Sequence, residues 1–278
     1  MYNVRLKHFQ DGEVQTRIYS HGVNSGYARS SPEKSEMVVE PFTNTKVRVV
    51  TSFTEEEKRK EECLYKSMKR AKQKIYDVAR ANIWEYFVTL TFNPDRVDRY
   101  DYSACTKKLA KWLDNTKQRV NHDFKYLVVP ELHKDGAYHF HGLIANCEGL
   151  QIVPSGHLDA RGNVIYNINS YDLGFTTATK VQENAAVTKY ITKYTTKELC
   201  QNSKGKKKYW ASRNCDLPLV EDYWLDTSDK EMLHEELIQD VMSFKTLDYM
   251  MDVRKRQVSY YENKGLTLNV ELSDDSIY

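Results

Sequence analysis

The chain has 278 residues, of which 40% are hydrophobic and 12% aromatic, and this composition favours a packed core and excludes global disorder. Its 41 lysines and arginines nearly balance 39 acidic residues, so any attraction to nucleic-acid phosphates must come from local placement of charge. The sequence shows no membrane-length apolar run and no signal-peptide core, and its five dispersed cysteines form no CxxC pair. These features predict a soluble, cytoplasmic protein with reduced thiols.

The first third of the chain predicts a small extension followed by a strand and a long helix. Residues 1–45 alternate weakly and then become rich in Gly and Ser, which indicates a hairpin and a loop. Val47–Phe53 is typical of a short strand, and Thr54 before three glutamates resembles an N-cap. Glu55–Ala81 carries apolar residues at helical spacing, and we expect most of its basic residues to form a solvated face.

The middle of the chain alternates strands and helices. Trp84–Phe92 is largely apolar and suits a central strand buried on both faces. A helix is expected over Ser103–Val120, with Leu109, Trp112, Leu113 and Val120 on its inner side. A second hairpin or long loop is expected within Leu150–Ile168, and a strand over Phe175–Val181. This pattern predicts an α+β fold, with a central antiparallel β-sheet and helices packed on it.

Two strands of a predicted hairpin carry a candidate metal site. Tyr126–Glu131 and Tyr138–Ala145 are β-rich and are joined by a turn that contains Gly136. Side chains alternate along a strand, so His139 and His141 project to one side, where the hairpin can bring Glu131 opposite them. Two imidazoles and a carboxylate would suit a divalent ion with open coordination positions. Taken alone, a His-x-His pair is more often a solvated strand face.

A pair of tyrosines forms the second constellation. Ala185–Cys200 predicts a helix, on which Tyr190 and Tyr194 share one face with Lys193 and Lys197. Two phenols interleaved with ammonium groups suit neither a buried core stripe nor a fully solvated face. The pattern therefore indicates a chemical role for the tyrosines.

The last part of the chain holds a basic cluster and a further helix. Lysines and aromatic side chains stand together in a segment that suits either single-stranded nucleic acid or an exposed loop before an edge strand: Lys206, Lys207, Lys208, Tyr209 and Trp210. Asp226–Met242 predicts an amphipathic helix, within a mostly helical C-terminal extension over residues 216–278. This extension could dock a partner or cover the back of the sheet.

Three ordered motifs carry a family resemblance. The strand FVTLTF (Phe87–Phe92), the HFHGLI segment preceded by Glu131, and YITKYTTK resemble the motifs of HUH endonucleases, the rolling-circle replication initiators. The paired tyrosines are similar to the two-tyrosine branch, which includes replication proteins of filamentous phages and microviruses. The resemblance spans residues 46–215 and leaves both ends unaccounted for.

The resemblance implies an antiparallel sheet that carries the histidines and is faced by the tyrosine helix. It implies that Tyr190 or Tyr194 nicks and rejoins single-stranded DNA at a phage or plasmid origin through a 5′-phosphotyrosyl intermediate, assisted by Mg²⁺ or Mn²⁺ at Glu131, His139 and His141. Lys193 and Lys197 would support the reaction by charge, and Lys189 and the basic cluster would bind DNA. A host helicase and polymerase are the expected partners, since the sequence has no GxxxxGK[ST] loop. A transposase or relaxase, or a non-catalytic DNA-binding replication-control protein, stays open as an alternative.

Overall fold

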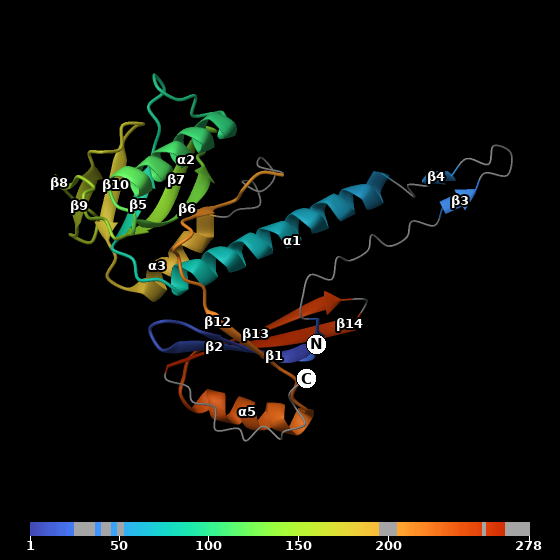
Figure 1. The fold of residues 1–278 in the computed structure, drawn as a ribbon. Helices are drawn as coiled ribbons and strands as arrows, with labels where there is room; N and C mark the ends of the chain where they lie inside the picture. The colour runs from blue at the N-terminus through green and yellow to red at the C-terminus, as the bar shows by residue number, and fades with distance from the viewer. Residues whose placement is uncertain (25–36, 40–45, 49–52, 195–204, 252–253, 265–278) are drawn as a thin grey trace. The chain divides into compact units, whose positions relative to one another are not determined.

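The computed structural model of the protein describes residues 1–24, 37–39, 46–48, 53–194, 205–251 and 254–264 (Figure 1). The chain divides into two compact units. Unit 1 combines Met1–Glu55 with Pro218–Tyr278, and unit 2 comprises Glu56–Leu217. All three sequence motifs lie in unit 2.

Unit 2 is built on a seven-stranded sheet in the order β11-β6-β7-β5-β10-β9-β8, in which each neighbouring pair is antiparallel. The strands β5 and β7 lie inside the sheet, which confirms the expected central position of the FVTLTF strand. The second hairpin is also confirmed, as β8 and β9. The strand bounds are Tyr86–Leu90 (β5), Lys125–Leu132 (β6), Tyr138–Ala145 (β7), Ile152–Leu158 (β8), Val164–Ile168 (β9), Thr176–Lys180 (β10) and Trp210–Ala211 (β11).

Helix α2 (Tyr102–Arg119) covers one face of this sheet. Asp101 caps its first turn by accepting a hydrogen bond from the Ser103 amide. The buried side chains Leu109 and Leu113 pack in one hydrophobic core with Phe140 of β7. Val120 was expected on the inner side but is 43% exposed, because the helix has ended before it.

The opposite face of the sheet is covered by α1 (Phe53–Arg80) and α3 (Asn184–Ile191). Ile75 of α1 and Ile191 of α3 are fully buried against Leu127 of β6 and Leu143 of β7. Burial of each such side chain contributes roughly 1.5–3 kcal/mol, so the α1 and α3 contacts are held by the hydrophobic effect.

The tyrosine helix is shorter than the sequence predicted. Its α-helical part ends at Ile191 and continues as a 3₁₀ turn, η1 (Thr192–Tyr194), and residues 195–200 of the predicted helix lie outside the described ranges. Thr192 donates its hydroxyl hydrogen to the Lys189 carbonyl at 2.9 Å, a local bond that competes with regular helix formation.

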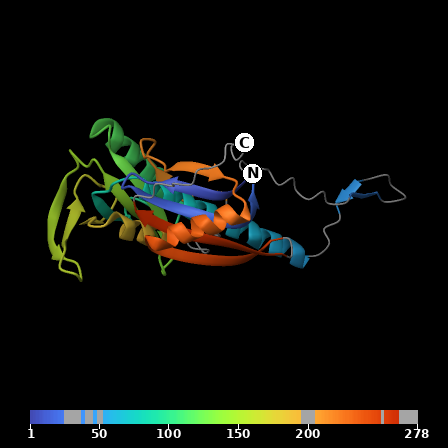
Figure 2. The same ribbon diagram turned by 90° about the horizontal axis from the view of Figure 1, so that it is seen from below.

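Unit 1 is a five-stranded antiparallel sheet in the order β12-β1-β2-β14-β13, with α5 (Thr227–Gln239) on one face (Figures 1 and 2). Leu233 and Leu237 of α5 pack on Val4, Leu6 and Tyr261. The hairpin β1–β2 confirms the prediction for the N-terminus, and α5 confirms the predicted amphipathic helix. The strand bounds are Tyr2–His8 (β1), Glu13–Val23 (β2), Leu219–Tyr223 (β12), Val241–Met251 (β13) and Arg254–Lys264 (β14).

The sequence prediction failed at three other places. The C-terminal part is mostly strand rather than mostly helix, because β12 and β14 extend the sheet begun by β1 and β2. The loop expected before residue 45 contains the short strand β3 (Met37–Val39), which pairs with β4 (Lys46–Arg48). The strand expected over Val47–Phe53 is wrong at its end, since Phe53 begins α1 and Thr54 lies within that helix. Within the described ranges, no helix combines the length and apolarity needed to cross a membrane.

Candidate metal and tyrosine site

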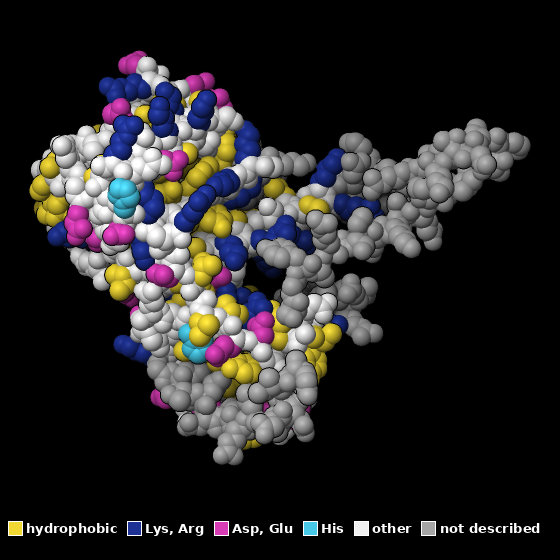
Figure 3. Space-filling model, in the orientation of Figure 1, with side chains coloured by type: hydrophobic (Ala, Val, Ile, Leu, Met, Phe, Trp, Pro, Cys, Tyr) yellow, Lys and Arg dark blue, Asp and Glu magenta, His cyan; other side chains and the backbone are white. Residues whose placement is uncertain are grey.

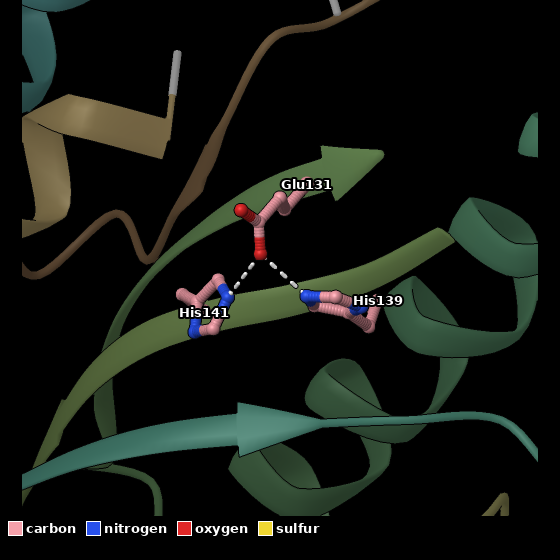
Figure 4. A group of neighbouring side chains, drawn as sticks. All are labelled: Glu131, His139 and His141. Carbon is pink, nitrogen blue, oxygen red and sulfur yellow. Dashed lines mark hydrogen bonds and ion pairs between the residues drawn. The ribbon is translucent and has the colours of Figure 1, made fainter. Parts of the chain in front are cut away.

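Glu131, His139 and His141 form one compact group at the β6–β7 hairpin (Figure 4). Glu131 lies directly opposite His139 in the strand register. One carboxylate oxygen, Oε2 of Glu131, lies 2.5 Å from Nε2 of His139 and 2.7 Å from Nε2 of His141. The three residues that the alternation placed on one face therefore converge on a single point.

Burial and hydrogen bonding set the charges in this group. Burial lowers the pKa of His141 from 6.5 to about 4, although hydrogen bonding to Glu131 works in the opposite direction. Burial alone would raise the pKa of Glu131, but hydrogen bonds from His141 and His139 outweigh it and lower that pKa. His141 is therefore neutral and Glu131 ionised near neutral pH, which are the protonation states of metal ligands.

Thr89 of β5 supports the group from behind. Its hydroxyl oxygen lies 3.1 Å from Nδ1 of His141, in the register pair that joins β5 to β7. Because a hydroxyl can donate or accept, Thr89 can serve either tautomer of His141. When Nδ1–H donates to Thr89, the Nε2 lone pair is free for a cation, as in the outer shell of many histidine–metal sites.

The donor set fits a divalent ion. Two imidazole nitrogens and one carboxylate oxygen occupy one side of an ion and leave coordination positions open to a substrate. The three ligand atoms lie within 4.8 Å of one another without a rearrangement of the strands. The hydrogen-bonded geometry is thus compatible with a divalent metal, whose identity this donor set does not fix.

The two tyrosines lie against the metal group. The Tyr194 ring stacks on the His141 ring with centroids 3.7 Å apart and planes 16° from parallel. Tyr190 packs edge-to-face on Tyr194 at 5.3 Å and is 46% exposed. Both tyrosines also contact Phe87 of β5, whose ring is stacked on His141. The predicted tyrosine pair and the predicted metal ligands therefore form one site.

Asn184 fixes the start of the tyrosine helix. Its side-chain amide donates to the carbonyl of Asn82 at 2.8 Å and of Ala79 at 3.4 Å. These bonds tie α3 to the end of α1, while Thr188 and Ile191 bury the inner side of α3. Burial and a hydrogen bond with Tyr190 raise the pKa of Tyr194 above its usual value, so this phenol is protonated near neutral pH.

The predicted lysines occupy different places around the site. Lys193 is exposed and its Nζ lies 5.5 Å from the centre of the Tyr190 ring, which puts a positive charge beside one phenol. Lys189 is exposed on α3. Lys197 lies outside the described residues.

The basic cluster is connected to α2 and to the edge strand β11. Lys206 contacts the Ser103 hydroxyl at 3.2 Å and lies over the Tyr102 ring, and the Tyr102 hydroxyl donates to the Lys207 carbonyl. The aromatic members, Tyr209 and Trp210, are half-buried and pack on the two cores of the sheet. Figure 3 shows the lysine and arginine side chains of the visible face interspersed with acidic ones, as the small net charge of +2 requires.

Sequence reasoning gave no role to Phe87 and Thr89, although it quoted the strand that contains them. Alternation along FVTLTF places both on one face, and this was the available signal. Their contact with His141 depends on the register between β5 and β7, which the sequence does not state.

Comparison with known proteins points to replication. Residues 85–199 match the family model described as replication-associated protein, ORF2/gene II protein type. The matched segment includes Glu131, both histidines and both tyrosines but covers less than half of the 278 residues. No curated protein and no solved structure matches the chain. The family match supports a replication initiator that works on DNA.

Proposed function

We propose that this protein nicks and rejoins single-stranded DNA at a replication origin by metal-assisted tyrosine transesterification, and so starts rolling-circle replication of a phage or plasmid. The observation that carries the proposal is the stacking of Tyr194 on His141 at 3.7 Å, with Tyr190 beside it. A binding protein would not require a phenol pair in contact with a candidate ligand set.

Glu131, His139 and His141 are the residues that would hold Mg²⁺ or Mn²⁺. When bound, such an ion polarises the scissile phosphate and offsets the charge that develops on its oxygens. The neutral imidazoles favour Mn²⁺ more than an all-oxygen site would.

In the cleavage step, the phenolic oxygen of Tyr190 or Tyr194 attacks the phosphorus atom. A tyrosyl O–P bond to the 5′-phosphate forms while the bond from phosphorus to the 3′-oxygen breaks. The phenolic proton ends on the departing 3′-hydroxyl. One phosphate ester replaces another, so a 3′-hydroxyl can later reverse the step without an external energy source.

The second tyrosine gives the site a second nucleophile. Because Tyr190 and Tyr194 lie 5.3 Å apart, one can hold a covalent strand while the other attacks a new junction. A phenol is a weak nucleophile in its neutral form. The ammonium of Lys193 beside Tyr190 would support the phenolate or the phosphate by charge, and Lys197 would do the same for Tyr194.

The DNA must be single-stranded or locally extruded, since phenols on a packed helix cannot reach into a closed duplex. We propose that Lys189, Lys206, Lys207 and Lys208 contact the strand, with Tyr209 and Trp210 beside them. A host helicase and polymerase would supply unwinding and synthesis.

Incubation with labelled single-stranded origin-region oligonucleotides and Mn²⁺, followed by a denaturing gel, tests the proposal. We expect a metal-dependent protein–DNA adduct, which peptide mass spectrometry assigns to Tyr190 or Tyr194. The double variant Tyr190→Phe/Tyr194→Phe should form no adduct but still bind DNA. Tyr65→Phe, an exposed tyrosine on α1, is the matched control.

Two outcomes would count against the proposal. Adduct formation by the double phenylalanine variant would show that the nucleophile lies elsewhere. Absence of any adduct across a broad set of phage and plasmid origins, despite DNA binding, would favour the binding-protein alternative.

A further inference from the structure

A pocket of about 580 Å³ lies at the end of β5, beside the start of β10. Thr91, Asn93, Arg96, Asp172, Gly174 and Phe175 are among the residues that line it. Phe175 is 64% exposed, an unusual state for a phenylalanine in a pocket wall. No step of the proposed reaction uses these residues.

The pocket opens on the sheet face that carries the metal ligands. Thr89 is paired with His141, and alternation puts Thr91 on the same face as Thr89. Phe175 lies opposite Thr91, to which its backbone is hydrogen-bonded. Phe175, Thr91 and His139 thus follow one row across three strands, so Phe175 lies ~10 Å, or two strand spacings, from His139.

The wall that holds Phe175 is rigid. The Thr91 amide donates to the Phe175 carbonyl at 3.0 Å, and the Asn93 amide donates to the Leu173 carbonyl at 2.9 Å. Gly174 is pressed on β5 so closely that a Cβ there would lie 2.3 Å from the Thr91 carbonyl oxygen. The Phe175 ring is therefore presented to solvent by a fixed backbone.

Arg96 supplies positive charge to the same pocket. It pairs with Asp172 at 3.8 Å through side chains that are both largely exposed, and it also donates to the Asp172 carbonyl. An exposed pair of this kind contributes only about 0–1 kcal/mol, so a phosphate can compete for the guanidinium.

We propose that this pocket binds one unpaired nucleotide of the strand next to the scissile phosphate, with its base stacked on Phe175 and its phosphate contacted by Arg96. An exposed aromatic ring beside a guanidinium is the arrangement that single-stranded nucleic-acid sites use, since every base offers a π-face. The inference rests on the proposed function, because it places the strand across the face that carries Glu131, His139 and His141.

Binding of labelled single-stranded oligothymidylate by fluorescence anisotropy tests the inference. The measurement uses the Tyr190→Phe/Tyr194→Phe protein in EDTA, so that cleavage plays no part. Adding Phe175→Ala should weaken binding about 5- to 150-fold, which corresponds to loss of one base stack. Phe175→Tyr should restore it, and Tyr65→Ala is the control for removal of an exposed aromatic side chain.

A second probe separates the base contact from the phosphate contact. An oligonucleotide of the same length made of abasic sites should bind the Phe175→Ala protein as well as the parent, because it has no base to stack. Arg96→Gln should weaken both probes and reduce the slope of log affinity against log salt by about one.

Equal affinity of the Phe175→Ala and parent proteins for oligothymidylate would overturn the inference, and so would an equal loss in Tyr65→Ala. The result is independent of the nicking reaction. An adduct formed by a protein whose Phe175 is silent in binding would refute the pocket alone. A stacking signal at Phe175 without any adduct would refute the nicking reaction alone.

Discussion

Replacement of Thr89 by valine tests whether the histidine–carboxylate group is a metal site. Valine has nearly the shape of threonine but cannot exchange a hydrogen with Nδ1 of His141, which now lies 3.1 Å from the Thr89 hydroxyl. With an ion on Nε2, the buried Nδ1–H of the variant has lost its acceptor. Outer-shell losses of this kind cost about 10- to 100-fold in metal affinity, or roughly 1.4–2.7 kcal/mol.

Calorimetric titration of Mn²⁺ into the metal-free protein measures this loss directly. We expect weaker binding by Thr89→Val within that range, and wild-type affinity in Thr89→Ser, which keeps the hydroxyl. Glu131→Gln should bind more weakly still, because it removes the only ionised oxygen ligand of the group. The reasoning is refuted if Thr89→Val binds Mn²⁺ as tightly as Thr89→Ser does.

Three further outcomes are expected. Metal-free protein should lose about 3 kcal/mol of unfolding free energy from His141 as pH falls from 6.5 to about 4, since unfolded histidine takes up a proton that the buried one refuses; urea titrations of His141→Gln should show a flatter pH dependence. Gly142→Ala should destabilise by about 1–3 kcal/mol in thermal unfolding, because the added methyl meets Val88 and Val128 at 3.1 Å. Asn184→Ala should lower the rate of adduct formation while leaving Mn²⁺ affinity unchanged, and an equal loss of both would contradict its placement at α3 alone.

The local parts of the site were predictable from sequence. The period of two along a strand fixes the facing of His139 and His141, and one short turn brings Glu131 to them. Tyrosines four apart share a side whether the backbone is a regular α-helix or ends in a 3₁₀ turn, so Tyr190 and Tyr194 were paired correctly despite the wrong helix end.

The parts that depend on distant pairing were not predictable. Thr89 and Phe175 gain their positions from the registers of β5 with β7 and β10, and no local pattern specifies those registers. The sheet of unit 1 joins β1 near the N-terminus to β12, more than 200 positions later, with Val4 opposite Tyr223. A single sequence carries no signal for such pairs, and the C-terminal strands were therefore interpreted as helical.

The division of labour between the β6–β7 hairpin and α3 has a consequence for how activity is lost. The ligand set is a local contact within one hairpin, with a small loop-closure cost, whereas the tyrosines arrive through a docked helix that buries few side chains. Sub-global opening of α3 therefore requires less free energy than rupture of the hairpin, and amide hydrogen exchange should be faster in α3 than in β7. Mild heating or low denaturant would yield chains that still chelate a cation but have lost their nucleophiles, and they would recover on redocking of a single helix.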